Sequence, residues 1–228
     1  MNRRRFAITA LATGVLAVAT VALAASPPAT WDNLVRVKSK KMQNVYMAPG
    51  ADFRPYTKVM LDPTEVAFKK NWAREYNSRT IRSLSGRISD ADVEQMVDEG
   101  GKAASETFAQ SFAAGGYPVV NAPGDDVLRV RTAIVNLTVT SPDKMTAGRS
   151  RTYSGEAGTA TLVVEARDSV SGALLARVVD SQVAGDSSIF LNRTRASNRA
   201  DFRALAQRWA KSTVSGLQQL KALSPVSG

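Results

Sequence analysis

The chain has 228 residues, no Cys and no His, and its 30 Lys and Arg residues against 20 Asp and Glu residues give a formal net charge of +10 at pH 7. The missing residue types exclude disulfide bonds, thiolate or His-ligated metal sites, and catalysis by Ser–His–Asp or Cys–His arrangements. The hydrophobic content of 44% is that of a globular chain, long enough for one domain with a substantial core.

The N-terminus has the three parts of a secretory signal peptide. Three Arg residues at positions 3–5 precede an uncharged segment that ends in Ala-Leu-Ala at positions 22–24. We therefore predict export to the periplasm with cleavage after about Ala24. An uncleaved N-terminal inner-membrane anchor is the alternative, because roughly 20 apolar residues can span a bilayer. The Arg run with Phe6 fits either the general secretory or the twin-arginine route.

A lipid anchor of the bacterial lipoprotein type is excluded, because that anchor requires a Cys at the cleavage point and the chain has none. Residues 25–43 then form a predicted flexible basic leader, with Lys38, Lys40 and Lys41 near its end. A short strand is expected around Tyr46, ended by a turn at positions 49–50.

The segment 57–68 mixes β-branched and apolar residues and is expected to be extended, with Pro63 marking a sheet edge or a bulge. Residues 69–87 are polar and are expected to form a surface excursion in which Trp72 is a packing anchor.

A helix is predicted to begin after Ser89, which is a good N-cap followed by acidic residues that favour the helix dipole. Apolar residues at spacings of three and four continue to Phe112, and Gly115 and Gly116 end the helix. A second Gly pair, at positions 100–101, is expected to interrupt this helix and to pack closely on a sheet.

Strands are predicted next. Residues 128–134 alternate apolar and polar side chains, with Arg129 and Arg131 on the outer face. The apolar phase changes after Ile134, which requires a bulge or a twist. Residues 157–184 form the strongest hairpin signal, with its turn at 169–172.

The last predicted helix spans about 198–223, and Arg193, Arg195 and Arg199 load its approach and first turn with positive charge. The order β-β-α-β-β-β-α predicts an α+β fold, a mainly antiparallel four- to five-stranded sheet with two helices packed on one face. The expected organisation is a signal peptide over 1–24, the leader over 25–43, one domain over 44–223 and a tail over 224–228.

Three stretches, 31–68, 115–134 and 158–180, resemble the bacterial domain-of-unknown-function family 3313, whose members are uncharacterised exported envelope proteins. The resemblance implies an exported α/β domain with no catalytic residues to transfer. Many members of that family look like lipoproteins, and this sequence departs from that pattern because it lacks the Cys.

The leading hypothesis is a non-enzymatic periplasmic accessory protein of the cell envelope that binds a protein partner or an anionic lipid or wall polymer. Export argues against nucleic acid as the partner, and no cofactor or metal ion is expected; the oligomeric state stays open. The candidate binding residues are Lys38, Lys40, Lys41, Arg129, Arg131, Arg193, Arg195 and Arg199.

Two alternatives stay open: a structural subunit of an envelope complex and a carboxylate-dependent envelope hydrolase, which needs two acids facing each other in a cleft. The candidate acids for a hydrolase are Asp125, Asp126, Glu165, Asp168 and Asp180.

Overall fold

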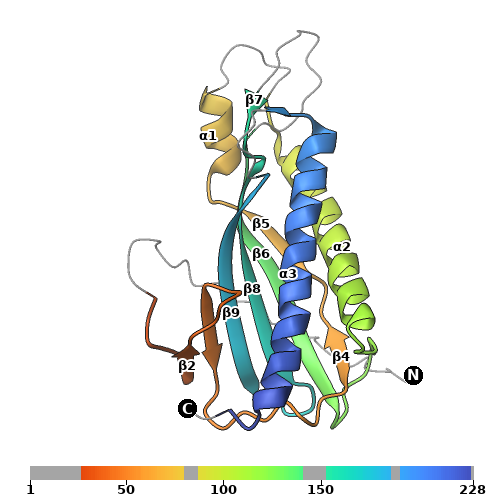
Figure 1. The fold of residues 1–228 in the computed structure, drawn as a ribbon. Helices are drawn as coiled ribbons and strands as arrows, with labels where there is room; N and C mark the ends of the chain where they lie inside the picture. The colour runs from red at the N-terminus through yellow and green to blue at the C-terminus, as the bar shows by residue number, and fades with distance from the viewer. Residues whose placement is uncertain (1–26, 80–86, 141–152, 186–190, 227–228) are drawn as a thin grey trace, which may run out of the picture.

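The computed structural model describes residues 27–79, 87–140, 153–185 and 191–226, which form a sheet covered on one face by two long helices (Figure 1). The predicted signal peptide over 1–24 lies outside the described residues. The strands are β1 (Thr30–Trp31), β2 (Leu34–Val37), β3 (Asn44–Met47), β4 (Lys58–Leu61), β5 (Glu65–Phe68), β6 (Val127–Val139), β7 (Tyr153–Ser154), β8 (Gly158–Asp168), β9 (Leu174–Ala184) and β10 (Leu191–Asn192). The helices are α1 (Trp72–Arg79), α2 (Asp90–Ala114) and α3 (Arg195–Leu223).

Eight strands form one mixed sheet in the order β1-β2-β3-β9-β8-β6-β4, and β5 pairs with β6 further along the edge that β4 uses. Neighbouring strands are antiparallel except β4 and β5, which run parallel to β6. The short strands β7 and β10 pair with each other outside this sheet. The α+β class with a mostly antiparallel sheet is therefore confirmed, whereas the predicted number of four to five strands is wrong.

The additional strands come from the segment predicted to be a flexible leader. β1 and β2 lie within residues 25–43 and pair in sequence onto the edge of β3. Leu34 is almost completely buried there, and Trp31 packs edge-on against Tyr46. Strands of two and four residues are too short to show a reliable alternation of apolar and polar side chains. They form because an existing sheet edge supplies their hydrogen-bond partners.

A third helix lies in the segment 69–87 that was predicted to be a surface excursion. α1 is short and mostly polar, so its sequence lacks a continuous apolar stripe. Trp72 is buried, as expected of a packing anchor, and stacks on Phe68 with ring centroids 4.3 Å apart. One aromatic contact attaches this helix to the end of β5.

The two long helices lie side by side on one face of the sheet, as predicted (Figure 1). Ser89 caps α2 in a capping box with Asp92. The helix runs without a break through Gly100 and Gly101, so the predicted interruption is wrong. The expected close approach to the sheet is correct, because a Cβ atom on Gly101 would lie 3.0 Å from the carbonyl oxygen of Thr64.

The predicted phase change in β6 occurs at a bulge. The register between β6 and β8 shifts between Val135 and Thr138, and Asn136 has a φ of 51°. The predicted hairpin is the β8–β9 pair, whose turn has Gly172 at a φ of 74°. Long strands β6, β8 and β9 thus form the centre of the sheet on which both helices pack.

Candidate anion-binding site

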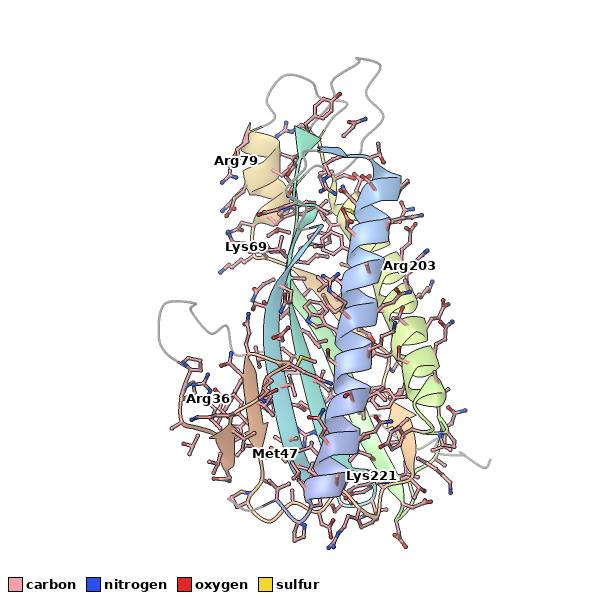
Figure 2. All side chains as sticks on the ribbon, viewed as in Figure 1. Arg36, Met47, Lys69, Arg79, Arg203 and Lys221 are labelled. Atoms are coloured by element: carbon pink, nitrogen blue, oxygen red, sulfur yellow. The ribbon has the colours of Figure 1, made fainter. Side chains whose placement is uncertain are left out.

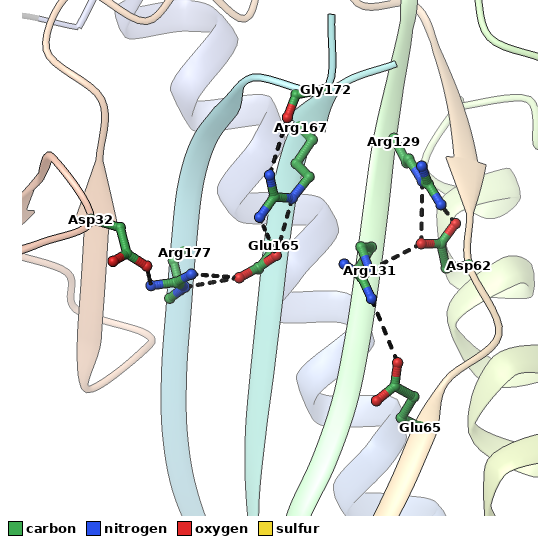
Figure 3. Close-up of polar contacts among 9 residues, drawn as sticks. All are labelled: Asp32, Asp62, Glu65, Arg129, Arg131, Glu165, Arg167, Gly172 and Arg177. Atoms are coloured by element: carbon green, nitrogen blue, oxygen red, sulfur yellow. Dashed lines mark hydrogen bonds and ion pairs between the residues drawn. The ribbon is translucent and has the colours of Figure 1, made fainter. Parts of the chain in front are cut away.

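Arg129 and Arg131 lie on the face of the sheet opposite α2 and α3, where both are neutralised by acidic residues of the neighbouring edge (Figure 3). Arg129 Nε lies 2.9 Å from an oxygen of Asp62, and Arg131 Nε lies 3.1 Å from the other oxygen. Glu65 is 3.7 Å from Arg131 Nη2. These two arginines therefore belong to a charge-balanced row on the sheet.

The same row continues across β8 and β9 (Figure 3). Glu165, only 4% exposed, accepts hydrogen bonds from Arg177 at 2.6 Å and from Arg167 at 2.8 Å. Arg177 also pairs with Asp32 at 2.6 Å and lies over the ring of Trp31. Burial raises the pKa of Glu165, but the hydrogen bonds from both arginines outweigh it, so that the pKa is lower than usual.

Arg193 and Arg199 are also engaged. Arg193 is buried at the start of α3, where it donates to the carbonyl oxygen of Ser154 at 2.9 Å and pairs with Asp201. Arg199 pairs with Glu99 of α2. A hydrogen bond from Gln95 lowers the pKa of Glu99, and the nearby charges of Arg199 and Arg195 add to that effect. The start of α3 is thus attached to α2 and to the end of the sheet.

The three lysines of the β2–β3 loop have a different environment. Lys38, Lys40 and Lys41 are exposed, and the ammonium of Lys41 reaches α3, where it donates to Ser215 Oγ at 2.6 Å. Ser215 lies four residues after Lys211 and seven after Arg208, so all three share one helix face. The loop therefore adds its charge to that face of α3.

We call Lys38, Lys40, Lys41, Arg208 and Lys211 the cationic patch. Across residues 27–79, 87–140, 153–185 and 191–226, none of these five side chains makes an ion pair. After Asp201, the rest of α3 contains no acidic residue. Basic side chains such as Arg36, Arg79 and Arg203 occur over much of the surface (Figure 2), so the patch is distinguished by the contact of Lys41 with the same face of α3 as Arg208 and Lys211, and not by basic residues alone.

The patch adjoins a groove of about 900 Å³. Arg208 of α3 and Lys69, which follows β5, both line it, together with strand residues such as Thr138, Thr159 and Ser181. This volume lies within the range typical of ligand-binding pockets. It is large enough for a ligand of several sugar or nucleotide units. We refer to it as the β9-edge groove.

The candidate acids for a hydrolase are held in separate structural roles. Asp180, 1% exposed, accepts hydrogen bonds from the backbone N–H of Gln43 and the indole N–H of Trp209, each at 2.8 Å. It projects to the helix-covered face, whereas Glu165 projects to the opposite face. These two acids cannot act on one substrate.

The remaining candidate acids lie near turns. Asp168 accepts from Ser171 in the β8–β9 turn and from the hydroxyl of Tyr56 at 3.0 Å. Asp126 accepts from Thr57 and pairs with Lys58 at 2.9 Å, and Asp125 is exposed. Among the described residues, no group of three or more acidic side chains is arranged to hold a metal ion.

Sequence reasoning did not include Arg208 and Lys211 among the binding residues. The signal was present, since both lie in a helix segment without acids, but nothing local shows that a loop about 170 residues earlier reaches the same helix face. Arg195 is exposed at the start of α3.

Comparison with known proteins gives one family match. A family model described as "Protein of unknown function (DUF3313)" matches residues 23–213. No curated protein matches.

Several solved structures are similar over much of the chain. The PelC dodecamer from Paraburkholderia phytofirmans is 12% identical, with a TM-score of 0.37, and the match covers 76% of this chain and 96% of that one. A minor lipoprotein from Acinetobacter baumannii is 11% identical, with a TM-score of 0.33 and coverage of 73% and 94%. A DUF4136 family protein from Bacteroides thetaiotaomicron is 13% identical, with a TM-score of 0.35 and coverage of 82% and 97%. At such TM-scores, nothing about activity or assembly follows for this chain.

Proposed function

Since this chain belongs to the DUF3313 family of proteins of unknown function, we propose that it is a non-enzymatic accessory protein of the bacterial envelope. It is exported to the periplasm and binds an anionic envelope component through the cationic patch. The export part rests on the N-terminal Arg run, the apolar segment and the Ala-Leu-Ala ending. Within the described part of the chain, no helix has both the length and the apolar character needed to cross a membrane.

The observation that carries the binding proposal is the contrast between two sets of basic residues. Arg129, Arg131, Arg193 and Arg199 have carboxylate partners, so their charges are largely cancelled at short range. Among the described residues, no side chain of the cationic patch makes an ion pair, and Lys41 donates to a hydroxyl, so the charge of the patch is available to an external anion.

The non-enzymatic part is supported by the engagement of the buried acids. Glu165 is occupied by two guanidinium groups, and Asp180 by backbone and indole donors. Neither carboxylate has the open, paired geometry that general acid–base hydrolysis needs.

The test compares charge reversal in the patch with charge reversal elsewhere. The patch variant is K40E/K41E/K211E, and the matched control is K70E/R74E/R79E on α1 and just before it, which changes net charge equally. The probes are vesicles containing phosphatidylglycerol and, separately, oligogalacturonate, each at about 20 mM and about 300 mM salt, because the longer screening length at low salt strengthens surface attraction.

We expect the native protein to bind at least one probe at low salt and to release it at high salt. The patch variant should bind at least tenfold more weakly, with the control within about threefold of native. No binding of native protein to either probe at low salt, or equal losses in the two variants, would contradict the proposal.

A further inference from the structure

The β9-edge groove curves around an edge of the sheet, and its lining contains hydroxyl groups as well as cationic side chains. β3 pairs with β9 over Ala176–Val179, so among the described strands the later part of β9 is an edge. Thr161 and Ser181 project to the face away from α3, whereas Ala160 and Gln182 project to the face that carries it, because neighbouring residues alternate. All four line the groove, which therefore wraps around this edge from one face of the sheet to the other.

Hydroxyl groups line the groove as two hydrogen-bonded pairs. Thr138 and Thr159 are joined at 2.8 Å, and Thr161 and Ser181 are joined at 2.8 Å. Each pair has two O–H groups and uses one as the donor between the partners, so one O–H and several lone pairs remain. The lining can thus both donate to and accept from the hydroxyl groups of a ligand.

The charge of the groove is positive. Arg208 lines it from α3, and Lys69 lines it from the end of β5, where Figure 2 shows the lysine on the α1 side of α3. Within the described part of the chain, the ion pair of Lys69 is an exposed 3.4 Å contact with Glu75. The single acidic residue among the described lining residues is Asp201, which is already paired with Arg193.

Two other ligand classes fit the groove poorly. An added peptide strand would need the outward backbone groups of Ser181, but the side-chain amide of Gln43 occupies both, donating to the carbonyl at 2.8 Å and accepting from the N–H at 3.2 Å. A planar bilayer surface cannot enter a groove that curves around a strand edge. The described lining residues include no aromatic ring, so recognition depends on hydrogen bonds and charge.

We propose that the β9-edge groove binds an anionic saccharide chain, with the hydroxyl pairs recognising sugar hydroxyls and Arg208 and Lys69 recognising the acidic groups. The inference rests on the proposed function and makes it specific: the anionic component is a carboxylated or phosphorylated glycan, and the cationic patch next to the groove extends its contact with the same chain.

The experiment measures calorimetric affinities of the purified protein for oligogalacturonate, for a neutral galactose oligomer of equal length, and for poly-glutamate of equal charge. Poly-glutamate carries the carboxylates without the sugar hydroxyls. We expect oligogalacturonate to bind at least tenfold more tightly than either of the other probes.

The variant T159V/S181A removes one hydroxyl from each pair and leaves the charge unchanged. It should weaken oligogalacturonate binding at least fivefold and leave poly-glutamate binding within twofold. R208Q, at an exposed position, should weaken binding of both charged probes. S78A/T107V removes two helix hydroxyls outside the groove and should change neither, and circular dichroism checks that each variant is folded.

Poly-glutamate binding as tight as oligogalacturonate binding, or equal losses in T159V/S181A for the two charged probes, would overturn the saccharide inference while leaving the anion-binding proposal standing. Binding of phosphatidylglycerol vesicles without binding of oligogalacturonate would do the same. Failure of the native protein to bind any anionic probe would instead refute the proposed function itself.

Discussion

Asp180 is the residue whose removal tests most directly how α3 is attached to the sheet. Its carboxylate lies beneath the helix and accepts hydrogen bonds from three donors: Gln43 N and Trp209 Nε1, both at 2.8 Å, and Gln182 Nε2 at 3.1 Å. The residue is 1% exposed, and the bond to Trp209 is buried. Asp180→Ala would therefore leave the buried indole N–H of Trp209 without its acceptor and remove the acceptor of the part-buried backbone N–H of Gln43.

The size of the effect follows from those two bonds. A hydrogen bond to a charged group contributes roughly 1.5–3 kcal/mol, so the two bonds together contribute about 3–6 kcal/mol. The bond to Gln182 contributes little, because that side chain is exposed and water can replace the carboxylate. Removing a buried carboxylate also relieves its desolvation cost, which favours the lower end of the range. We expect a loss of about 3 kcal/mol.

Urea denaturation followed by circular dichroism measures the free energy of unfolding, and Asp125→Ala is the matched control, because that Asp is exposed in a turn. The control should lie within about 0.5 kcal/mol of native. A loss below about 1 kcal/mol for Asp180→Ala would refute the reasoning, since it would mean that the buried donors find other partners or that α3 is held by its apolar contacts alone.

Two further predictions concern α2 and the charge row. Gly100→Ala should stabilise the protein by up to about 1 kcal/mol, because Ala has the higher helix propensity. The new methyl fits, since it would lie 3.8 Å from Val66 in ordinary contact. Gly101→Ala should be less stable than Gly100→Ala by at least about 1 kcal/mol, because its methyl meets a backbone oxygen at 3.0 Å; equal urea midpoints would contradict this packing. Glu165→Gln should cost about 3 kcal/mol at pH 7 by leaving buried guanidinium charge uncompensated. The pKa of Glu165 is lowered in the folded state, so its contribution is complete above the usual glutamate value of 4.5 and is lost as pH falls through the lowered value. The stability difference between the variant and native should therefore shrink in acid, and a constant difference from pH 7 to pH 2 would argue against the ion pairs.

The sequence alone determined the elements whose signals are local. The N-cap Ser89, the end of α2 at Gly115–Gly116, the β8–β9 turn and the bulge in β6 all depend on the conformational preferences of a few adjacent residues, and each was predicted at the observed place. The α+β class followed from the order of these elements. Zero Cys and zero His settled equally firmly which chemistries the chain cannot perform.

Tertiary structure decided the sheet edges and the charge environment. β1 and β2 form because β3 offers them a free edge, which no local pattern in a basic leader shows. All eight predicted binding residues are cations in the sequence, yet docking of distant segments gives Arg129, Arg131 and Arg199 acidic partners and brings Lys41 to α3. The physical reason is that an electrostatic interaction depends on distance in space. The distance between residues far apart in the chain is set by the packing of the helices on the sheet, and it cannot be obtained from their spacing in the sequence.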